Sequence, residues 1–194
     1  MVKVYCTFIK NGVYTKEWVY KLRDRISRNS TVPFEFICLT NEKLLGIDTI
    51  AIKNVDEQWA KIELCNPSID GRIHHIGLDS FIIGNIDFFL REEESLLSYD
   101  STEETIKSSS IFILNEHERS LVWNSACKFH ECIDVYADCL DGKLRTIQEK
   151  HPGKIQRCKS PDDVLLFGTK ILNFSGEARP SDFKDKHWLK TYYW

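Results

Sequence analysis

A run of apolar, mostly β-branched residues between Arg72 and Asp87 (RIHHIGLDSFIIGNID) contains a single carboxylate near its middle, Asp79. Both flanks of Asp79 have the composition of a strand that is buried on both faces. Burying an unpaired carboxylate inside such a strand would cost several kcal/mol. The sequence therefore predicts that a core strand ends at Asp79 and that this residue faces an open cleft, where it could hold a cation.

The first half of the chain alternates strand-like and helix-like patterns. Strands are predicted over Val2–Ile9, Phe34–Leu39, Thr49–Ile52 and Arg72–Leu78. Two helices lie between them, one capped by Thr15 with Trp18, Val19, Leu22 and Ile26 at helical spacing, the other with Trp59, Ile62 and Leu64 inward. This order predicts an α/β domain of Rossmann-like type, with a central mixed, mostly parallel sheet flanked by helices.

The second half is less regular. A short helix is predicted to begin at Phe88–Leu90, followed by a strand over Leu96–Tyr99, a polar loop over Ser101–Ser110 and a strand over Ile111–Leu114. A further strand is predicted over Leu121–Phe129, leading into a helix around Glu131–Leu140, and a last strand over Lys170–Phe174. The aromatic tail Phe183–Trp194 is expected to fold back as a helix. No repeat and no linker is evident, so residues 1–194 are expected to form one domain.

Composition narrows the class of protein. A net charge of −3 and a pI near 6.1 argue against a nucleic-acid binder, which would show a basic face. The seven cysteines are odd in number and scattered, which suits a reducing compartment better than a disulfide scaffold. No leader-like start and no apolar run near the ~20 residues of a membrane span is present. These features favour a soluble, cytoplasmic protein.

The ends of the predicted parallel strands carry polar residues. In open α/β sheets, ligands bind outside the carboxyl ends of the strands. This rule places Thr7–Lys10, Thr40-Asn41 and Asp79 on one rim. The sequence thus predicts a ligand cleft there.

Four segments in this arrangement resemble the GT-A glycosyltransferases, which use nucleotide sugars and commonly a manganese ion. They are the opening VYCTFIKNGVY, the segment WAKIELC followed by GRIHHIGLDSFIIGNID with its DxD-like Gly77-Leu78-Asp79, the turn-like Trp123-Asn124-Ser125-Ala126, and the closing loop ILNFSGEARP. Their order and spacing match glycogenin-like enzymes over nearly the whole chain. The nearest likeness is to a small viral version, such as the N-terminal domain of a chlorovirus multidomain protein.

The chain departs from the family pattern at three positions. Gly77 replaces the first acid of the DxD motif, and Asn173 replaces the histidine that would ligate metal from the closing loop. Ala126 replaces the glycine of the "NSG" turn. The first two changes remove ligands or charge from the implied metal site. Either metal affinity would be lower, with water or diphosphate oxygens in the vacant positions, or other residues would compensate.

The resemblance implies a role for each matching residue. Asp79 and Asn173 would hold the metal, Mn²⁺ or Mg²⁺. The phosphates would be bound by Lys61, Gly176 and Arg179 beside Leu78, and the sugar hydroxyls by Asn124 and Ser125. The base and ribose would be contacted by Thr7, Phe8, Lys10 and Tyr14, with Thr40 or Asn41 at the uracil edge. The chemistry is consistent with these residue types, since a carboxylate suits a hard cation and Arg grips two phosphate oxygens.

Plainer explanations exist for several of these residues. Asp79 could cap a turn, Asn173 could satisfy backbone groups, and Lys61 could sit on a solvated helix face. Adjacent strand residues point to opposite faces, so His74 and His75 are not expected to share a metal.

Other patterns favour structural roles. Cys127-x-x-His130-x-Cys132 with Cys139 matches no structural zinc spacing well. Glu92-Glu93-Glu94 is expected to be a solvated helix end, and Trp188, Tyr192, Tyr193 and Trp194 are expected to pack.

The resemblance implies a metal-dependent transferase that moves a hexose or 6-deoxyhexose, of glucose or rhamnose type, from a UDP-sugar to a glycan or glycoprotein, with retention favoured. No general base stands out, because Asp134 and Asp138 could equally face solvent. Two alternatives stay open. One is a catalytically weak nucleotide-sugar-binding domain that recruits partners. The other is an unrelated nucleotide-binding module, disfavoured because the first strand lacks a G-x-G-x-x-G or P-loop motif.

Overall fold

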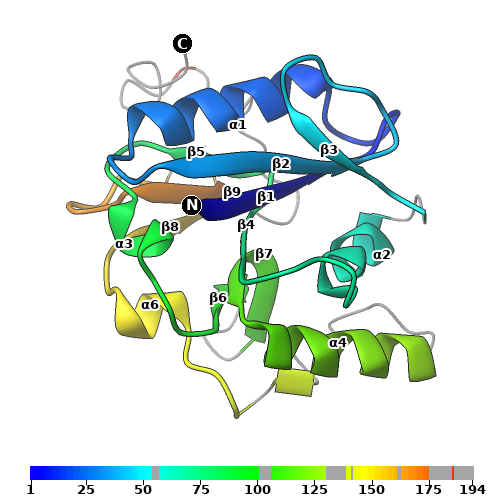
Figure 1. Cartoon of the computed structure of the whole chain (residues 1–194). Coiled ribbons are helices and arrows are strands. Elements are labelled where there is room, and N and C mark those ends of the chain that lie inside the picture. The colour runs from blue at the N-terminus through cyan, green and yellow to red at the C-terminus, as the bar shows by residue number, and fades with distance from the viewer. Residues whose placement is uncertain are drawn as a thin grey trace.

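The computed structural model describes residues 1–53, 57–100, 106–129, 139–140, 142–160, 163–174 and 185. They form a six-stranded sheet of order β3-β2-β1-β4-β7-β6 and a three-stranded sheet of order β5-β9-β8 (Figure 1). The main sheet contains β1 (Val2–Phe8), β2 (Phe34–Thr40), β3 (Asp48–Ala51), β4 (Ile73–Ile76), β6 (Leu96–Asp100) and β7 (Ile106–Leu114). The small sheet contains β5 (Ser80–Ile82), β8 (Ile155–Cys158) and β9 (Ile171–Phe174).

The first half of the main sheet is parallel, as predicted. β1 pairs in parallel with both β2 and β4, and β2 pairs in parallel with β3. β7 then pairs antiparallel with β4, and β6 pairs antiparallel with β7. The predicted fold class, a mixed and mostly parallel sheet flanked by helices, is confirmed.

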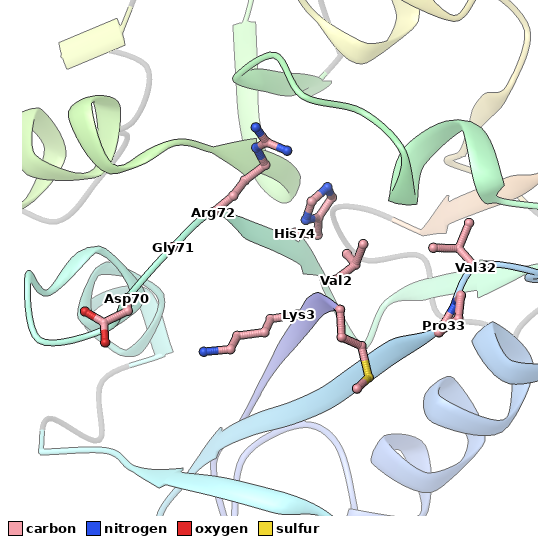
Figure 2. A pocket seen from close by; sticks show the side chains of 9 residues that line it. Val2, Lys3, Val32, Pro33, Asp70, Gly71, Arg72 and His74 are labelled. Atoms are coloured by element: carbon pink, nitrogen blue, oxygen red, sulfur yellow. The ribbon is translucent and has the colours of Figure 1, made fainter.

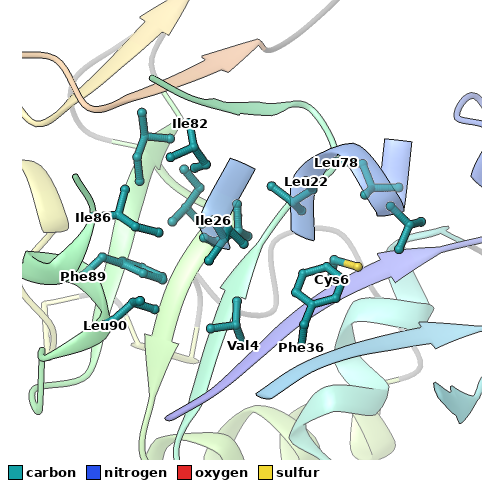
Figure 3. Packing of buried hydrophobic residues seen from close by; sticks show 14 of the residues in the cluster. Val4, Cys6, Leu22, Ile26, Phe36, Leu78, Ile82, Ile86, Phe89 and Leu90 are labelled. Atoms are coloured by element: carbon teal, nitrogen blue, oxygen red, sulfur yellow. The ribbon is translucent and has the colours of Figure 1, made fainter. Parts of the chain in front are cut away.

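Alternate residues of β1 face different layers of helices. Val4, Cys6 and Phe8 pack in a core with α1 (Lys16–Arg28) and the small sheet, whereas Tyr5 packs on the opposite side. Figure 3 shows Val4 and Cys6 near Leu22 and Ile26 of α1. The helices α2 (Glu57–Ile62), η1 (Glu63–Cys65) and α4 (Glu116–Phe129) contribute to the second core. The sheet is thus buried on both faces, which explains its nearly continuous apolar strands.

The first helix begins as predicted, with Thr15 at the N-cap position. Its side chain makes no capping hydrogen bond, so the helix depends on Val19, Leu22 and Ile26, which are buried. No helix among the described residues is long and apolar enough to span a membrane. The six cysteines in the described ranges carry free thiols.

Two predictions for the second half are wrong. Residues Ile106–Ser110 belong to β7 rather than to a loop, because they pair with β6. The three consecutive serines gave no local indication of this pairing. Leu121–Phe129 is not a strand but the end of α4, in which Val122 and Ala126 are buried one helical turn apart. The short strand β8 was not predicted. The predicted helix around Glu131 and the tail Phe183–Trp194 fall almost entirely outside the described residues.

The prediction that Glu92-Glu93-Glu94 forms a solvated helix end is also wrong. α3 (Asp87–Leu90) ends before these residues, and the Glu92 side chain is only 6% exposed. Its carboxylate accepts hydrogen bonds from Lys150 Nζ at 2.7 Å and lies 2.9 Å from His151 Nε2. Lys150 is the last residue of α6 (Ile147–Lys150), and its Nζ also forms an ion pair with Glu94 at 2.7 Å. This cluster ties α6 to the loop after α3.

The Glu92 carboxylate gives the first prediction. Burial raises its pKa, but hydrogen bonds from Lys150, from the Glu94 backbone N–H and from His151 outweigh burial and lower the pKa from 4.5 to about 2. A lowered pKa in the folded state adds stability above pH 4.5 that is lost as the pH falls toward 2. We expect Glu92→Gln to lower the free energy of unfolding by about 3 kcal/mol at pH 7, because it leaves a partly buried cation short of a partner.

Urea unfolding at pH 7 and at pH 3 measures this effect, and the difference between variant and wild type should narrow at the lower pH. Glu93→Gln is the matched control, since Glu93 is the exposed neighbour. Equal losses in the two variants would show that the cluster does not stabilise the fold.

Candidate functional site

The carboxyl ends of β1 and β2 meet at one edge of the main sheet. Asn41 joins them, because its side-chain oxygen accepts a hydrogen bond of 2.7 Å from the Lys10 backbone N–H. Thr40 is buried, and its hydroxyl accepts a bond of 3.1 Å from the Glu42 N–H. The structure therefore brings Lys10, Thr40 and Asn41 together, as the sequence analysis expected.

The residues at the end of β1 face in different directions. Thr7 is half-buried and its hydroxyl lies 3.5 Å from His75 Nε2. Phe8 is turned the other way, into the core beneath α1, and is 3% exposed. Beyond a tight turn closed by Gly12 N–H to Ile9 O, Tyr14 is half-buried with its ring edge-on to Trp18. Thr7 and Tyr14 are thus partly accessible and Lys10 is exposed, whereas the Phe8 side chain is buried in the core.

Asp79 lies at the end of β4, in a turn that links the two sheets. Ser80 N–H closes the turn on Gly77 O at 3.0 Å, Gly77 N–H donates to Ser110 O at 2.8 Å, and Phe174 N–H donates to Asp79 O at 2.9 Å. Asp79 itself is half-buried. A core strand does end here, as the lone carboxylate predicted.

Gly77 makes room for the Asp79 carboxylate. A Cβ on residue 77 would overlap Asp79 Oδ1 and would lie 3.0 Å from the carbonyl oxygen of Ser110. The carboxylate therefore fills the space that a side chain at position 77 would need. At the two positions where the DxD motif has acids, this chain has Gly77 and Asp79, and the Asp79 carboxylate lies against Gly77.

The closing strand β9 lies directly beside this turn. Asn173 pairs with Ser80 across the β5–β9 ladder and is 3% exposed. Its Oδ1 atom is buried and makes no hydrogen bond to any described residue. Gly176 and Arg179, which the resemblance assigned to the phosphates, lie outside the described residues.

The oxygen atoms of Asp79 and Asn173 suit a hard cation. Carboxylate and amide oxygens are ligands for Mn²⁺ and Mg²⁺, and Asn173 Oδ1 accepts no hydrogen bond from the part of the chain that the structure describes. Among the described residues, no three or more His, Cys, Asp or Glu side chains gather as a metal site. Asp79 and Asn173 would supply only two protein ligands to a divalent cation, and diphosphate oxygens would have to supply others. His130 and Cys132 of the zinc pattern lie outside the described ranges.

His75 and Lys61 lie on the α2 side of the sheet. His75 is fully buried and stacks on Phe112 with ring centroids 4.6 Å apart. Burial, with a smaller effect from the Lys61 charge, lowers the pKa of His75 from 6.5 to about 3, so the ring is neutral at pH 7. Lys61 is half-buried and close enough to be felt by this ring. Its side chain is thus neither buried nor fully exposed.

His74 points to the other face, as predicted for adjacent strand residues. Its ring packs edge-on against Phe89 at 5.5 Å, and Nε2 lies 3.3 Å from Glu92 O. Burial lowers the pKa of His74 to about 4. The two histidines cannot share one metal.

Asn124 and Ser125 do not lie in a turn. Both belong to α4, where Asn124 is exposed and Ser125 is half-buried, and α4 packs against η1 and α2. The segment that lies beside Gly77 is instead the end of the serine run, Ser110. Sequence reasoning missed Ser110 because it predicted a loop there; the following apolar run Ile111–Leu114 was the available signal for a longer strand.

A separate open cavity of about 750 Å³ lies at the amino ends of β1 and β4 (Figure 2). Its lining includes Lys3, Val32, Asp70, Arg72 and His74. This is the edge opposite Asp79, so the cavity is distinct from the site that the sequence predicts.

Comparison with solved structures identifies proteins of the same fold. A scan against models of protein families found no match, and a search of curated proteins found none. Among solved structures, the glycosyltransferase GlyE of Streptococcus pneumoniae TIGR4 matches with a TM-score of 0.66 and 9% identity over 92% of this chain and 55% of GlyE. An active-site mutant of LgtC matches with a TM-score of 0.65 and 8% identity over 97% of this chain and 93% of LgtC.

The bifunctional glycosyltransferase WbbM matches with a TM-score of 0.64 and 10% identity over 99% of this chain and 51% of WbbM. The chain thus spans about half the length of GlyE and WbbM, and nearly all of LgtC. At such low identity the likeness shows the fold alone. The fold is the GT-A fold of glycosyltransferases.

The fit of Asp79 over Gly77 gives the second prediction. We expect Gly77→Ala to lower the free energy of unfolding by about 1–3 kcal/mol, because the new methyl group meets a carboxylate oxygen and a backbone oxygen. The loss should be smaller in an Asp79→Ala background, where one of these atoms is gone. Urea unfolding of the four proteins in a double-mutant cycle measures this coupling.

Gly84→Ala is the control, because there the added Cβ meets only the flexible side chain of Lys170. A Gly77→Ala loss that is the same with and without the Asp79 carboxylate would contradict the arrangement described above.

Proposed function

We propose that this protein is a glycosyltransferase that uses a UDP-sugar donor and transfers a hexose or 6-deoxyhexose to a glycan or glycoprotein acceptor. The observation that carries the proposal is the Gly77–Ser80 turn, which holds one carboxylate at the carboxyl edge of the parallel strands, beside Asn173 of the small sheet. Ligands of open α/β sheets bind at that edge. The proposal is also supported by the fold, which is shared with several glycosyltransferases.

In this proposal the nucleotide lies over the ends of β1 and β2. Thr7, Lys10 and Tyr14 contact the base and ribose, Phe8 packs beneath them, and the joined Thr40 and Asn41 lie at the uracil edge. Asn41 is fixed by the Lys10 N–H, so this part of the site is organised before the nucleotide binds. Preorganised polar groups lose little conformational entropy on binding.

The diphosphate lies near Asp79 and Leu78. Asp79 and Asn173 would hold Mn²⁺ or Mg²⁺, which would supply positive charge to stabilise the departing diphosphate. Lys61 contributes a further positive charge from α2, and Gly176 and Arg179 are proposed to bind the phosphates. Fixed cationic groups are effective there because charge develops on the leaving group in the transition state.

Asn124 and Ser125 are proposed to contact sugar hydroxyls, from helix α4 rather than from a turn. Retention of anomeric configuration is proposed on the resemblance to glycogenin-like enzymes.

A second candidate is a nucleotide-sugar-binding domain with little or no catalysis, acting as an interaction module. The single acid over Gly77 and the amide at Asn173 favour it, because both reduce the negative charge available to a metal. Donor binding alone does not separate the two candidates, whereas turnover does.

The third prediction concerns Asp79. We expect Asp79→Asn to weaken metal-dependent UDP binding by about tenfold or more, since even residues that only hydrogen-bond to a metal's ligands are worth roughly 10- to 100-fold in metal affinity. Isothermal titration calorimetry with UDP, with and without Mn²⁺, measures it. Asp70→Asn, an exposed carboxylate at the opposite edge, is the control. Metal-dependent UDP binding that survives Asp79→Asn would show that Asp79 is not the cation ligand.

The fourth prediction separates the two candidate functions. A glycosyltransferase is expected to hydrolyse one or a few of a panel of UDP-sugars slowly, and to do so faster with Mn²⁺. Release of UDP, followed by a coupled assay over the panel, measures this. Tight UDP binding without hydrolysis of any donor would instead support the interaction module.

A further inference from the structure

Three exposed apolar side chains lie close together in the loop that leads into β9. Val164 and Leu166 are 75% and 60% exposed, and Phe167 is fully exposed. Other large apolar side chains that are exposed among the described residues lie singly in the sequence: Met1, Val13 and Leu45. Single exposed apolar residues are ordinary, whereas three within four positions indicate a surface that contacts an apolar partner. We name Val164, Leu166 and Phe167 the apolar tip.

A buried glutamine holds the apolar tip in a fixed shape. Gln156 of β8 is 9% exposed, and its Nε2 donates to Val164 O at 2.8 Å while its Oε1 accepts from the Leu166 N–H at 2.8 Å. The same Oε1 accepts from Thr169 Oγ1 at 3.1 Å. Leu165 is half-buried and packs against residues of the small sheet. The apolar side chains are therefore displayed by an anchored loop, so ordering them on binding costs little conformational entropy.

The same hydrogen bonds suit the backbone of the tip to an apolar environment. Val164 O and the Leu166 N–H are bonded to the Gln156 amide, and Leu166 O accepts from the Thr169 N–H at 3.3 Å. Backbone groups that leave water for a lipid phase are costly unless the protein itself supplies their partners. At these positions the protein supplies them, so the tip can leave water without breaking its backbone bonds.

The size and shape of the tip favour a lipid surface over a protein partner. Stable protein interfaces bury about 800 Å² on each partner and involve roughly 20–30 residues a side. The apolar tip has three side chains, and its loop projects from the body of the protein before β9, at the left of Figure 1. A small projecting apolar tip can enter the interfacial region of a bilayer, where aromatic and aliphatic side chains are favoured.

Two lysines flank the tip and give it positive charge. Lys154 and Lys170 are half-exposed, and the Lys170 N–H donates to Lys154 O at 2.9 Å, so their backbones are adjacent. Neither forms an ion pair with a residue that the structure describes. Asp163 instead accepts hydrogen bonds from the backbone N–H groups of residues 159 and 160, at the start of the loop. Lysines beside an apolar tip are attracted to anionic lipid headgroups.

We propose that the apolar tip docks this protein on the surface of an anionic lipid bilayer. The side chains of Val164, Leu166 and Phe167 enter the interfacial region, and Lys154 and Lys170 lie against the headgroups. The inference does not depend on the proposed function, because the tip shares no residue with the candidate site at the carboxyl edge of the main sheet.

Cosedimentation of the full chain with lipid vesicles tests this inference. We expect binding to vesicles of phosphatidylcholine and phosphatidylserine, and weaker binding to phosphatidylcholine alone or at high salt. Phe167→Ala should weaken binding by about tenfold, because it removes most of the apolar area of one inserted side chain. Phe167→Trp should bind at least as tightly, since Trp is favoured at membrane interfaces. Leu45→Ala, at an exposed leucine outside the tip, is the matched control and should bind like the wild type.

The lysines are tested on the same vesicles. Lys170→Gln should weaken binding to the mixed vesicles by about fivefold, the effect of one basic residue near an anionic surface. Its binding to phosphatidylcholine alone should equal that of the wild type, because no anionic headgroup is present there. An equal loss on both kinds of vesicle would contradict the electrostatic part of the inference.

Several outcomes would overturn the inference. They are a wild type that does not bind the mixed vesicles, binding that Phe167→Ala leaves unchanged, and a loss in Phe167→Trp as large as in Phe167→Ala. A Phe167-dependent dimer in sedimentation velocity, without vesicle binding, would assign the tip to a second copy of the chain and overturn it as well. UDP calorimetry on Phe167→Ala reports the proposed function separately, and we expect it to match the wild type whichever way the vesicle assay falls.

Discussion

The passage of the chain from the main sheet to the small sheet, in the four residues Gly77–Ser80, is the constraint on which the candidate site depends. Backbone hydrogen bonds hold this turn from both sides, from Gly77 to Ser110 of β7 and from Phe174 of β9 to Asp79. A carboxylate in a free loop would sample many positions, whereas here the backbone around Asp79 is fixed by both sheets. Binding groups carried by rigid elements lose less entropy when a ligand binds.

The parallel half of the fold could be predicted from the sequence, whereas the candidate site could be predicted only in part. β1, β2 and β4 are buried on both faces, so each is a continuous apolar run and its end is marked by polar residues. Their common edge could therefore be predicted, and the structure joins Lys10 to Asn41 there. The small sheet has short strands whose partners are far apart in sequence. β8 is only four residues long, and nothing local in Ile155–Cys158 indicates that Arg157 lies beside Asn173.

The errors in the second half have a common physical origin in tertiary contacts. The serines before Ile111 favour a loop by composition, but pairing with β6 makes them a strand. The residues around Asn124 match a turn motif in letters, yet Val122 and Ala126 bury one face of a helix there. Glu92 belongs to a run of three acids that looks solvated, but Lys150 and His151, more than fifty residues later, enclose it. Local pattern cannot report partners that are distant in the chain.

Gly77 changes meaning once the structure is known. Compared with the DxD motif, Gly77 lacks the first acid, which suggests a weakened metal site. In the fold it is the residue that allows the Asp79 carboxylate to lie against the end of β4, because any side chain at that position would occupy the same space. Adding an acid at position 77 would therefore displace the acid at position 79 before it could contribute a second ligand. A site confined to one carboxylate needs positive charge from elsewhere to hold a diphosphate. In the function proposed above, that charge comes from a bound divalent cation and from Lys61 of α2.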